Sequence, residues 1–176
     1  MLKLYESTPG TPILSLRTGG PIATLISPII NPNNLYLEGW HVEDNRSRQP
    51  LVLLSNDIRD VLPQGFVVND HEVLAAADEL IRLKEVLKLE FNLLGLKVTS
   101  ENGTRYGKVN DYAFETKNFF IQKLYVNQSL VKNFNGGTLS IDRSQIVEVT
   151  DKRVVIEEPT EKSRVRRGAA SPSVAG

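Results

Sequence analysis

The sequence is poor in the side chains that carry most enzyme chemistry: its 176 residues include no cysteine and only two histidines. The absence of cysteine excludes disulfides, thiolate catalysis and cysteine-ligated metals. His41 and His71 are too few for a multi-histidine metal site. The sequence also contains no P-loop, no Gly-x-Ser-x-Gly elbow and no His-Glu-x-x-His motif. We therefore expect a protein that is not an enzyme and that holds neither a metal nor a cofactor.

Long hydrophobic runs are missing as well. No apolar stretch approaches the roughly 20 residues needed to cross a bilayer, and the N-terminal residues do not follow the pattern of a signal peptide. We therefore expect no transmembrane segment and a cytoplasmic location. The hydrophobic fraction of 40% is nevertheless sufficient for a packed core.

Neither sign of charge predominates, because 21 Lys and Arg stand against 21 Asp and Glu. A chain without excess positive charge is a poor candidate for coating nucleic acid. The neutral total conceals an asymmetry. Residues 159–176 carry four cations and one glutamate, which leaves 17 basic and 20 acidic side chains for residues 1–158.

The last 18 residues differ in kind from the rest of the chain. Residues 159–176 contain two valines and no aromatic side chain, so they cannot bury enough apolar area to offset the entropy lost on ordering. We expect a disordered basic tail there. Its cations are candidates for binding a partner, although a solubilising terminus is the other interpretation; they are Lys162, Arg164, Arg166 and Arg167.

Residues 70–94 contain neither glycine nor proline and place apolar side chains at helical spacing. This pattern predicts an amphipathic connecting helix. Leu83, Val86 and Leu89 lie off the main apolar stripe. The excess apolar surface makes this helix a candidate for joining two copies in a homodimer.

The strand-rich zones on either side of residues 70–94 repeat each other. A shift of 84 or 88 residues superposes their apolar and glycine positions, as in Gly19 with Gly103, Leu25 with Val109, and Leu53 with Ile141. Each copy has about five short apolar runs broken by turn residues, which is typical of short strands. Asn102-Gly103 and Asp151-Lys152 provide two-residue hairpin turns in the second copy. Such strands, with nothing else to cover them, favour a small closed barrel.

The second copy resembles the PRC-barrel family, named after the cytoplasmic subunit of the photosynthetic reaction centre. The resemblance rests on Gly95-Leu-Lys-Val98, on Asn102-Gly103, on Tyr106-Gly107-Lys108-Val109-Asn110-Asp111-Tyr112, and on the closing residues 139–149 and 154–156. It covers about residues 95–158, and residues 1–69 are interpreted as a diverged N-terminal PRC-like barrel. The expected fold class is mostly β: two small PRC-like antiparallel β-barrels joined by the 70–94 helix, with the disordered tail at 159–176.

The resemblance implies a non-catalytic scaffold or adaptor that binds a protein partner. Charged residues that recur before the closing hairpin of each copy are candidates for that contact: Asp57, Arg59, Asp142 and Arg143. A solvated rim with local ion pairs is the other interpretation of these residues. The two-barrel arrangement also resembles the ribosome-maturation factors that bind the small subunit. That likeness implies, as an alternative, an RNA- or ribosome-associated role.

Three individual residues have structural interpretations that we favour over functional ones. Trp40 corresponds to Leu124 in the second copy, which indicates core packing. Asp111 follows Gly107 in a strand, so its carboxylate is expected to accept hydrogen bonds from backbone amides at a bulge. His71 stands between two acidic residues at the start of the expected helix, where a solvated position is more common than a general base.

Overall fold

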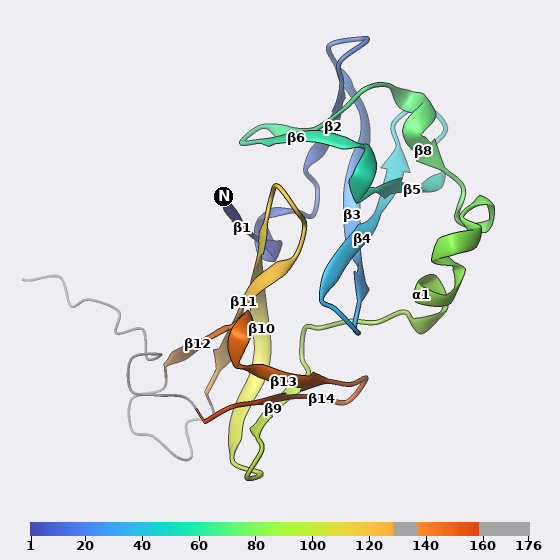
Figure 1. The fold of residues 1–176 in the computed structure, drawn as a ribbon. Coiled ribbons are helices and arrows are strands. Elements are labelled where there is room, and N and C mark those ends of the chain that lie inside the picture. Colours follow the sequence, from blue (N-terminus) through green and yellow to red (C-terminus); the bar gives the residue numbers. More distant parts are fainter. Residues whose placement is uncertain (129–136, 159–176) are drawn as a thin grey trace, which may run out of the picture.

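The computed structural model describes residues 1–128 and 137–158. These residues form two seven-stranded sheets, the N-terminal one in the upper part of Figure 1 and the C-terminal one below it. The N-terminal sheet has the order β6-β7-β2-β3-β4-β5-β8. Its strands are β2 (Pro12–Ser15), β3 (Pro21–Asn31), β4 (Tyr36–Asp44), β5 (Pro50–Leu54), β6 (Ile58–Leu62), β7 (Gly65–Val68) and β8 (Leu74–Ala75).

The C-terminal sheet has the order β12-β11-β10-β9-β14-β13, and β1 pairs with the far end of β10. Its strands are β1 (Leu2–Leu4), β9 (Lys97–Ser100), β10 (Arg105–Glu115), β11 (Ile121–Asn127), β12 (Thr138–Asp142), β13 (Ile146–Val149) and β14 (Arg153–Ile156). Buried and more exposed residues alternate along β12, so this strand presents one apolar face to the interior.

The strand pairing confirms the internal repeat. The path from β6 to β5 through the first sheet matches the path from β13 to β12 through the second. The long central hairpins are bulged at equivalent places, between Leu25 and Ser27 in the first copy and between Val109 and Asp111 in the second. Identical bulge positions bend both hairpins in the same way, so the two copies share their shape as well as their order.

The prediction of antiparallel barrels is right in its β class and wrong in two details. Within the described residues the sheets are open, because β6 does not pair with β8, nor β13 with β12. In addition, β2 pairs with β7 and β9 with β14 in the parallel direction. The closing hairpin of each copy therefore lies along the first strand of that copy, where it extends the sheet.

The two sheets share one continuous hydrophobic core, which removes the need for each to close on itself. Trp40 of the first repeat is fully buried, with its ring centroid 6.0 Å from that of Phe114 and 5.5 Å from that of Phe119 in the second repeat. The predicted core position of Trp40 is therefore confirmed. Each copy therefore covers apolar side chains of the other.

The repeats meet along a pseudo-twofold axis. The backbone N–H of Leu37 donates to the carbonyl of Phe119 at 2.9 Å, and the N–H of Ile121 donates to the carbonyl of Leu35 at the same distance. The shift of 84 residues that relates the two copies converts each of these bonds into the other. Leu35 and Phe119 both adopt left-handed backbone angles, with φ of 53° and 56°. The symmetry resembles that of a C2 dimer interface, here contained in one chain.

The predicted helix over residues 70–94 is wrong. The only α-helix of the described residues is α1 (Lys84–Leu89), preceded by the 3₁₀ turns η3 (His71–Val73), η4 (Ala77–Glu79) and η5 (Ile81–Leu83). A straight helix of 25 residues would extend about 37 Å and carry its apolar side chains away from the sheets. Burial in the tertiary structure determines the conformation of this segment instead of helical propensity. Leu74, Leu83 and Leu93 each reach the interior separately, and Leu74 pairs with the edge of β5.

Because that long helix is absent, the continuous apolar helix face that was expected to join two copies is absent too. Leu83 is buried against Ile29 and Val52, and Val86 packs beside it. Leu89 remains exposed at the end of α1. The short 3₁₀ turns η1 (Tyr5–Ser7), η2 (Ser55–Asp57) and η6 (Arg143–Gln145) complete the described elements. The tail predicted for residues 159–176 lies outside the described residues, and no helix in the described part is long and apolar enough to cross a membrane.

Candidate functional site: a basic groove on the C-terminal repeat

A groove of about 1660 Å³ lies on the C-terminal repeat, lined by the β9–β10 hairpin, by Asn127 and Gln128, and by the turn between β13 and β14 with Arg153. It is open to solvent, and its described lining contains five cationic side chains and a single carboxylate, that of Asp151. All five cations are exposed: Lys97, Arg105, Lys108, Lys152 and Arg153. None of them makes an ion pair with a carboxylate within residues 1–128 or 137–158.

Three of these cations form a row across neighbouring strands. Lys97 of β9 is paired in register with Lys108 of β10 on one side and with Arg153 of β14 on the other. Paired positions in a sheet project to the same face, with Cβ atoms about 5 Å apart. Like charges at such positions destabilise a sheet. The fold therefore tolerates a repulsive arrangement at this place.

The N-terminal repeat provides an internal comparison for the row. Pro12 pairs with Thr24 at the position equivalent to Lys97 and Lys108, and the counterpart of Arg153 is Gly65. The scaffold thus forms equally well with uncharged residues at all three positions. The row is a property of the C-terminal copy and is not a requirement of the fold.

Local backbone chemistry holds the groove in shape. Gly107 has φ of 140°, and a Cβ atom there would lie 1.9 Å from the carbonyl oxygen of Asn127. Only glycine permits this close approach of β10 to β11. On the opposite wall, the hydroxyl of Thr150 accepts hydrogen bonds from the N–H groups of Lys152 and Arg153 at 3.2 and 3.1 Å. The predicted Asp151-Lys152 hairpin turn is therefore confirmed, and it fixes where those two cations project.

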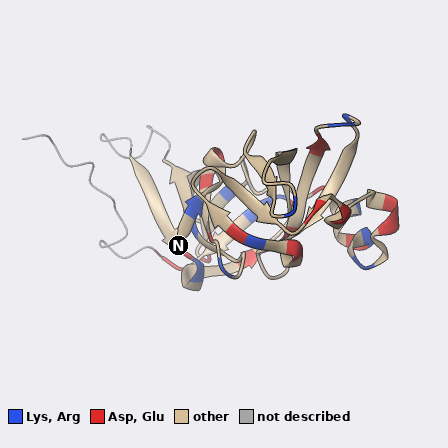
Figure 2. Cartoon of the chain, turned by 90° about the horizontal axis from the view of Figure 1, so that it is seen from above, with Lys and Arg blue, Asp and Glu red and all other residues tan. Residues whose placement is uncertain are grey.

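The charge of the groove contrasts with that of the connector between the repeats. The helical turns around α1, on the right of Figure 2, carry both acidic and basic side chains. Lys88 there pairs with Glu85 at 2.9 Å. Such mixed surfaces attract ligands of neither sign strongly. The groove is the place in the described chain where unpaired positive charge is concentrated around a concave surface.

Of the residues that sequence reasoning proposed for partner contact, those that the structure describes do not line the groove. Lys162, Arg164, Arg166 and Arg167 are outside the described residues. Asp57 ends η2 and is half-buried, whereas Arg59 is exposed on β6 and donates from Nε to the side-chain oxygen of Asn69 at 2.9 Å. Neither Asp57 nor Arg59 lines the groove.

Asp142 and Arg143 lie near the contact between the repeats. Asp142 is exposed at the end of β12 and pairs with Lys123 at 3.3 Å. The guanidinium of Arg143 donates to the carbonyl of Ile121 at 3.0 Å and to that of Asn34 in the other repeat. It also lies over the ring of Phe120, 4.9 Å from the centroid. Arg143 is thus occupied in joining the two copies.

Outside the groove, the titratable pair Asp44 and His71 has structural partners. The carboxylate of the buried Asp44 accepts from the Ser47 hydroxyl at 2.6 Å and lies 3.0 Å from Nε2 of His71. These hydrogen bonds, first that of Ser47 and then that of His71, hold the pKa of Asp44 well below its usual range. His71 is therefore half-exposed beside a carboxylate, whereas full solvation was expected.

Asp111 occupies the role expected of it. Its Oδ1 accepts from the N–H of Tyr112 at 2.8 Å and from that of Glu6 at 3.2 Å, at the bulge in β10. Burial, the largest influence, raises the pKa of this carboxyl. Among the described residues, no group of three or more His, Asp or Glu side chains is arranged to hold a metal ion.

Sequence reasoning missed the groove because its cations do not form a run. They come from three strands and one turn, and the register of those strands brings them together. Comparisons of the chain with protein-family models and with curated proteins find no match.

Proposed function

We propose that this protein is a non-catalytic adaptor that holds an acidic segment of a protein partner in the groove of its C-terminal repeat. The observation that carries the proposal is the row of Arg153, Lys97 and Lys108 in register on three adjacent strands. Mutual repulsion within the row is relieved when carboxylates lie against it, so a ligand of opposite charge gains affinity there. The PRC-barrel resemblance supports the adaptor class.

The size and shape of the groove favour an extended peptide. A strand-like segment rises about 3.3 Å per residue and places alternate side chains on one side. Acidic side chains at every second position therefore repeat at about 6.6 Å, and the long Lys and Arg side chains on strands about 5 Å apart can spread to reach them. Asn127, Gln128 and Thr150 at the rim supply polar groups for the backbone of such a segment.

RNA is the alternative occupant, because phosphates also match a row of cations. Sequence-tolerant binding of single-stranded RNA relies on aromatic platforms on which bases stack. The groove offers one aromatic residue, the half-buried Tyr106, whose hydroxyl contacts Glu158. Five cations without a stacking surface favour an acidic peptide over RNA.

The experiment compares three ligands on the full chain at low ionic strength. Fluorescence anisotropy is measured with a labelled peptide of alternating Glu and Gly, with its Gln analogue, and with an oligouridine of equal length. The double variant Lys97→Gln/Lys108→Thr places at position 108 the residue found at the equivalent position of the N-terminal repeat. It is expected to weaken binding of the acidic peptide about threefold to tenfold.

Two controls separate the groove from other positive charge. Lys117→Gln removes an exposed cation of the same repeat, in the turn between β10 and β11 and outside the groove, and binding is expected to stay unchanged. A full-length variant with Gln at 162, 164, 166 and 167 removes the tail cations. If this variant loses binding while the groove variant keeps it, the tail is the site and the proposal fails. Oligouridine could instead bind more tightly than the acidic peptide, with this binding lost in the groove variant. That result would assign the RNA-associated role and reject the peptide-binding one.

A further inference from the structure

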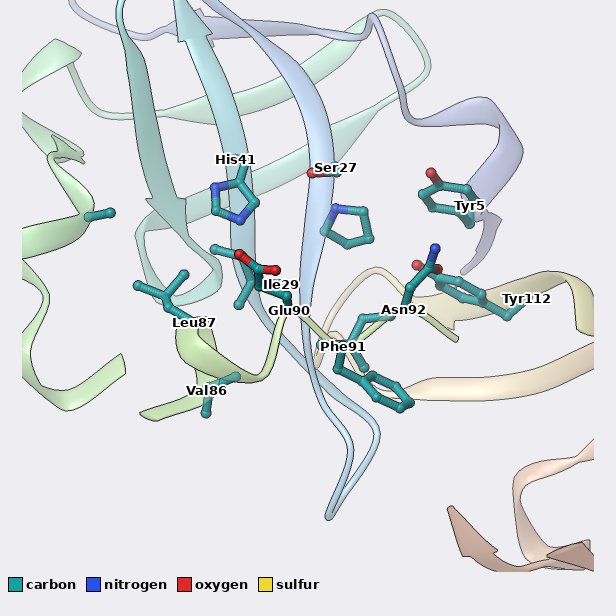
Figure 3. Close-up of a pocket in the computed structure, with 13 residues that line it drawn as sticks. Tyr5, Ser27, Ile29, His41, Val86, Leu87, Glu90, Phe91, Asn92 and Tyr112 are labelled. Carbon is teal, nitrogen blue, oxygen red and sulfur yellow. The ribbon is translucent and has the colours of Figure 1, made fainter. Parts of the chain in front are cut away.

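A second cavity lies between the two repeats, away from the basic groove (Figure 3). It has a volume of about 540 Å³. One wall is β3 of the N-terminal sheet, another is the connector around α1, and the C-terminal repeat contributes Tyr112. Pro28 and Tyr112, which are equivalent under the shift of 84 residues, both line it. The cavity therefore lies where the two copies approach each other, a common location for small-molecule sites.

Tyr112 is the unusual residue of this cavity. Its side chain is 1% exposed, and its buried hydroxyl has no hydrogen-bond partner within the described residues. Buried tyrosine hydroxyls ordinarily find a partner, because an unsatisfied polar group in the interior costs free energy. In Figure 3 the hydroxyl end of Tyr112 is turned toward the cavity side occupied by Asn92. Phenylalanine would fill the same space, so the hydroxyl has no packing role.

The ring of Tyr112 is held in place by its neighbours. Tyr5 stacks on it with ring centroids 5.1 Å apart and planes at 23°. The backbone beside it is fixed by the Asp111 carboxylate, which accepts from the Tyr112 N–H. The hydroxyl therefore occupies a defined position, as expected of a group that orients a ligand. Burial also raises the pKa of Tyr112 well above its ordinary value, so the group is a neutral O–H at any physiological pH.

The remaining walls indicate what kind of molecule fits. Ile29, Val86, Leu87 and Phe91 provide an apolar lining, and Phe91 follows Glu90, whose left-handed backbone (φ 44°) ends α1 and turns the chain toward the cavity. His41 contributes an imidazole whose pKa is lowered by burial, so it is uncharged at neutral pH. Ser27 and Asn92 add neutral polar groups. The lining carries one charged side chain, Glu90, which is exposed.

We propose that this cavity binds a small uncharged molecule with a ring or branched apolar body and one oxygen atom that hydrogen-bonds to the Tyr112 hydroxyl. The apolar body packs against Ile29 and Phe91, which come from the N-terminal sheet and the connector. The ligand thus contacts both repeats and the segment between them. This site is separate from the basic groove and does not depend on the function proposed for it.

The test uses phenol and toluene as matched probes of nearly equal size, one with and one without the oxygen. Each is titrated into the full-length protein while the ring resonances of His41, Phe91 and Tyr112 are followed by NMR. Phenol is expected to shift all three and to bind more tightly than toluene. In Tyr112→Phe, phenol affinity is expected to fall about threefold to tenfold, the range for one hydrogen bond, while toluene affinity stays the same. Tyr125→Phe, outside the cavity, is the control and should change neither.

Three results would overturn the proposal. The first is that phenol leaves the three resonances unshifted. The second is that wild-type protein binds phenol and toluene with equal affinity, which needs no variant and so stands even if Tyr112→Phe folds poorly. The third is that Tyr112→Phe melts at the wild-type temperature or above and binds phenol as tightly as the wild type does.

Discussion

Lys97 and Lys108 lie directly opposite each other on β9 and β10, whereas the same positions of the N-terminal repeat hold Pro12 and Thr24. Two equivalent hairpins in one chain thus differ in whether they place like charges side by side. Because the uncharged pair supports the same strand pairing, the charged pair is unnecessary for folding. This difference between the copies is the basis of the function proposed for the C-terminal groove.

The charge row makes a prediction about stability. Lys108→Thr is expected to raise the free energy of unfolding at low ionic strength by about 0.2–1 kcal/mol, because it relieves repulsion from Lys97. The gain should shrink at high salt, where exposed charges are screened. Urea unfolding at two salt concentrations measures it, with Lys117→Thr as the control. A loss of stability in Lys108→Thr at low salt would show that the row is not repulsive.

The close approach of β10 to β11 makes Gly107 hard to replace. Gly107→Ala is expected to lower the free energy of unfolding by about 1–3 kcal/mol, because the added Cβ meets the Asn127 carbonyl and alanine disfavours φ of 140°. Gly20→Ala is the matched control, since no atom lies within 4 Å of a Cβ there. Its effect should stay within about 0.5 kcal/mol. Equal unfolding midpoints for the two variants would contradict this account of the groove wall.

The Asp44 carboxylate predicts how stability depends on pH. Its pKa is depressed in the folded state, so the stabilisation is present above the unfolded pKa of about 3.9 and is lost as the pH falls below that value. Asp44→Asn is expected to lower the free energy of unfolding at neutral pH by about 1–3 kcal/mol and to flatten the acid limb of the stability profile. Glu72→Gln, exposed nearby, serves as the control. An acid limb unchanged in Asp44→Asn would refute the assignment.

Arg143 is expected to act on stability through the contact between repeats. Arg143→Lys removes the two-carbonyl fork and the stacking on Phe120, which an ammonium cannot reproduce, and should cost about 1–2 kcal/mol. Arg59→Lys, on the surface of β6, should cost less than about 0.5 kcal/mol. Thermal or urea unfolding distinguishes them. If Arg143→Lys keeps full stability but loses binding of the acidic peptide, Arg143 is a partner-binding residue, as its recurrence in the sequence first indicated.

Features encoded by local residue chemistry were predictable from the sequence. The repeat follows from the spacing of apolar residues, and the Asp151-Lys152 turn and the role of Asp111 follow from the preferences of the residues themselves. Residues 70–94 show the limit of such reasoning. Their helical propensity is real, but the pairing of Leu74 with β5 and the separate burial of Leu83 and Leu93 override it.

The groove and the open sheets depend on contacts between distant parts of the chain. Arg153 and Lys97 are brought together by a parallel pairing that the antiparallel prediction did not contain. The shared core around Trp40 likewise depends on how the copies meet, through bonds such as that from Leu37 to Phe119. Neither relation can be read from local spacing, because both are set by tertiary packing.

The most direct test of the central claim is an NMR titration of the full-length, ¹⁵N-labelled protein with the acidic peptide of alternating Glu and Gly. The account predicts that backbone amide shifts concentrate at the groove, including Gly107, Thr150 and Arg153, and that the equivalent positions Ala23 and Gly65 stay unchanged. Shifts distributed equally over both repeats, or confined to residues 159–176, would contradict it.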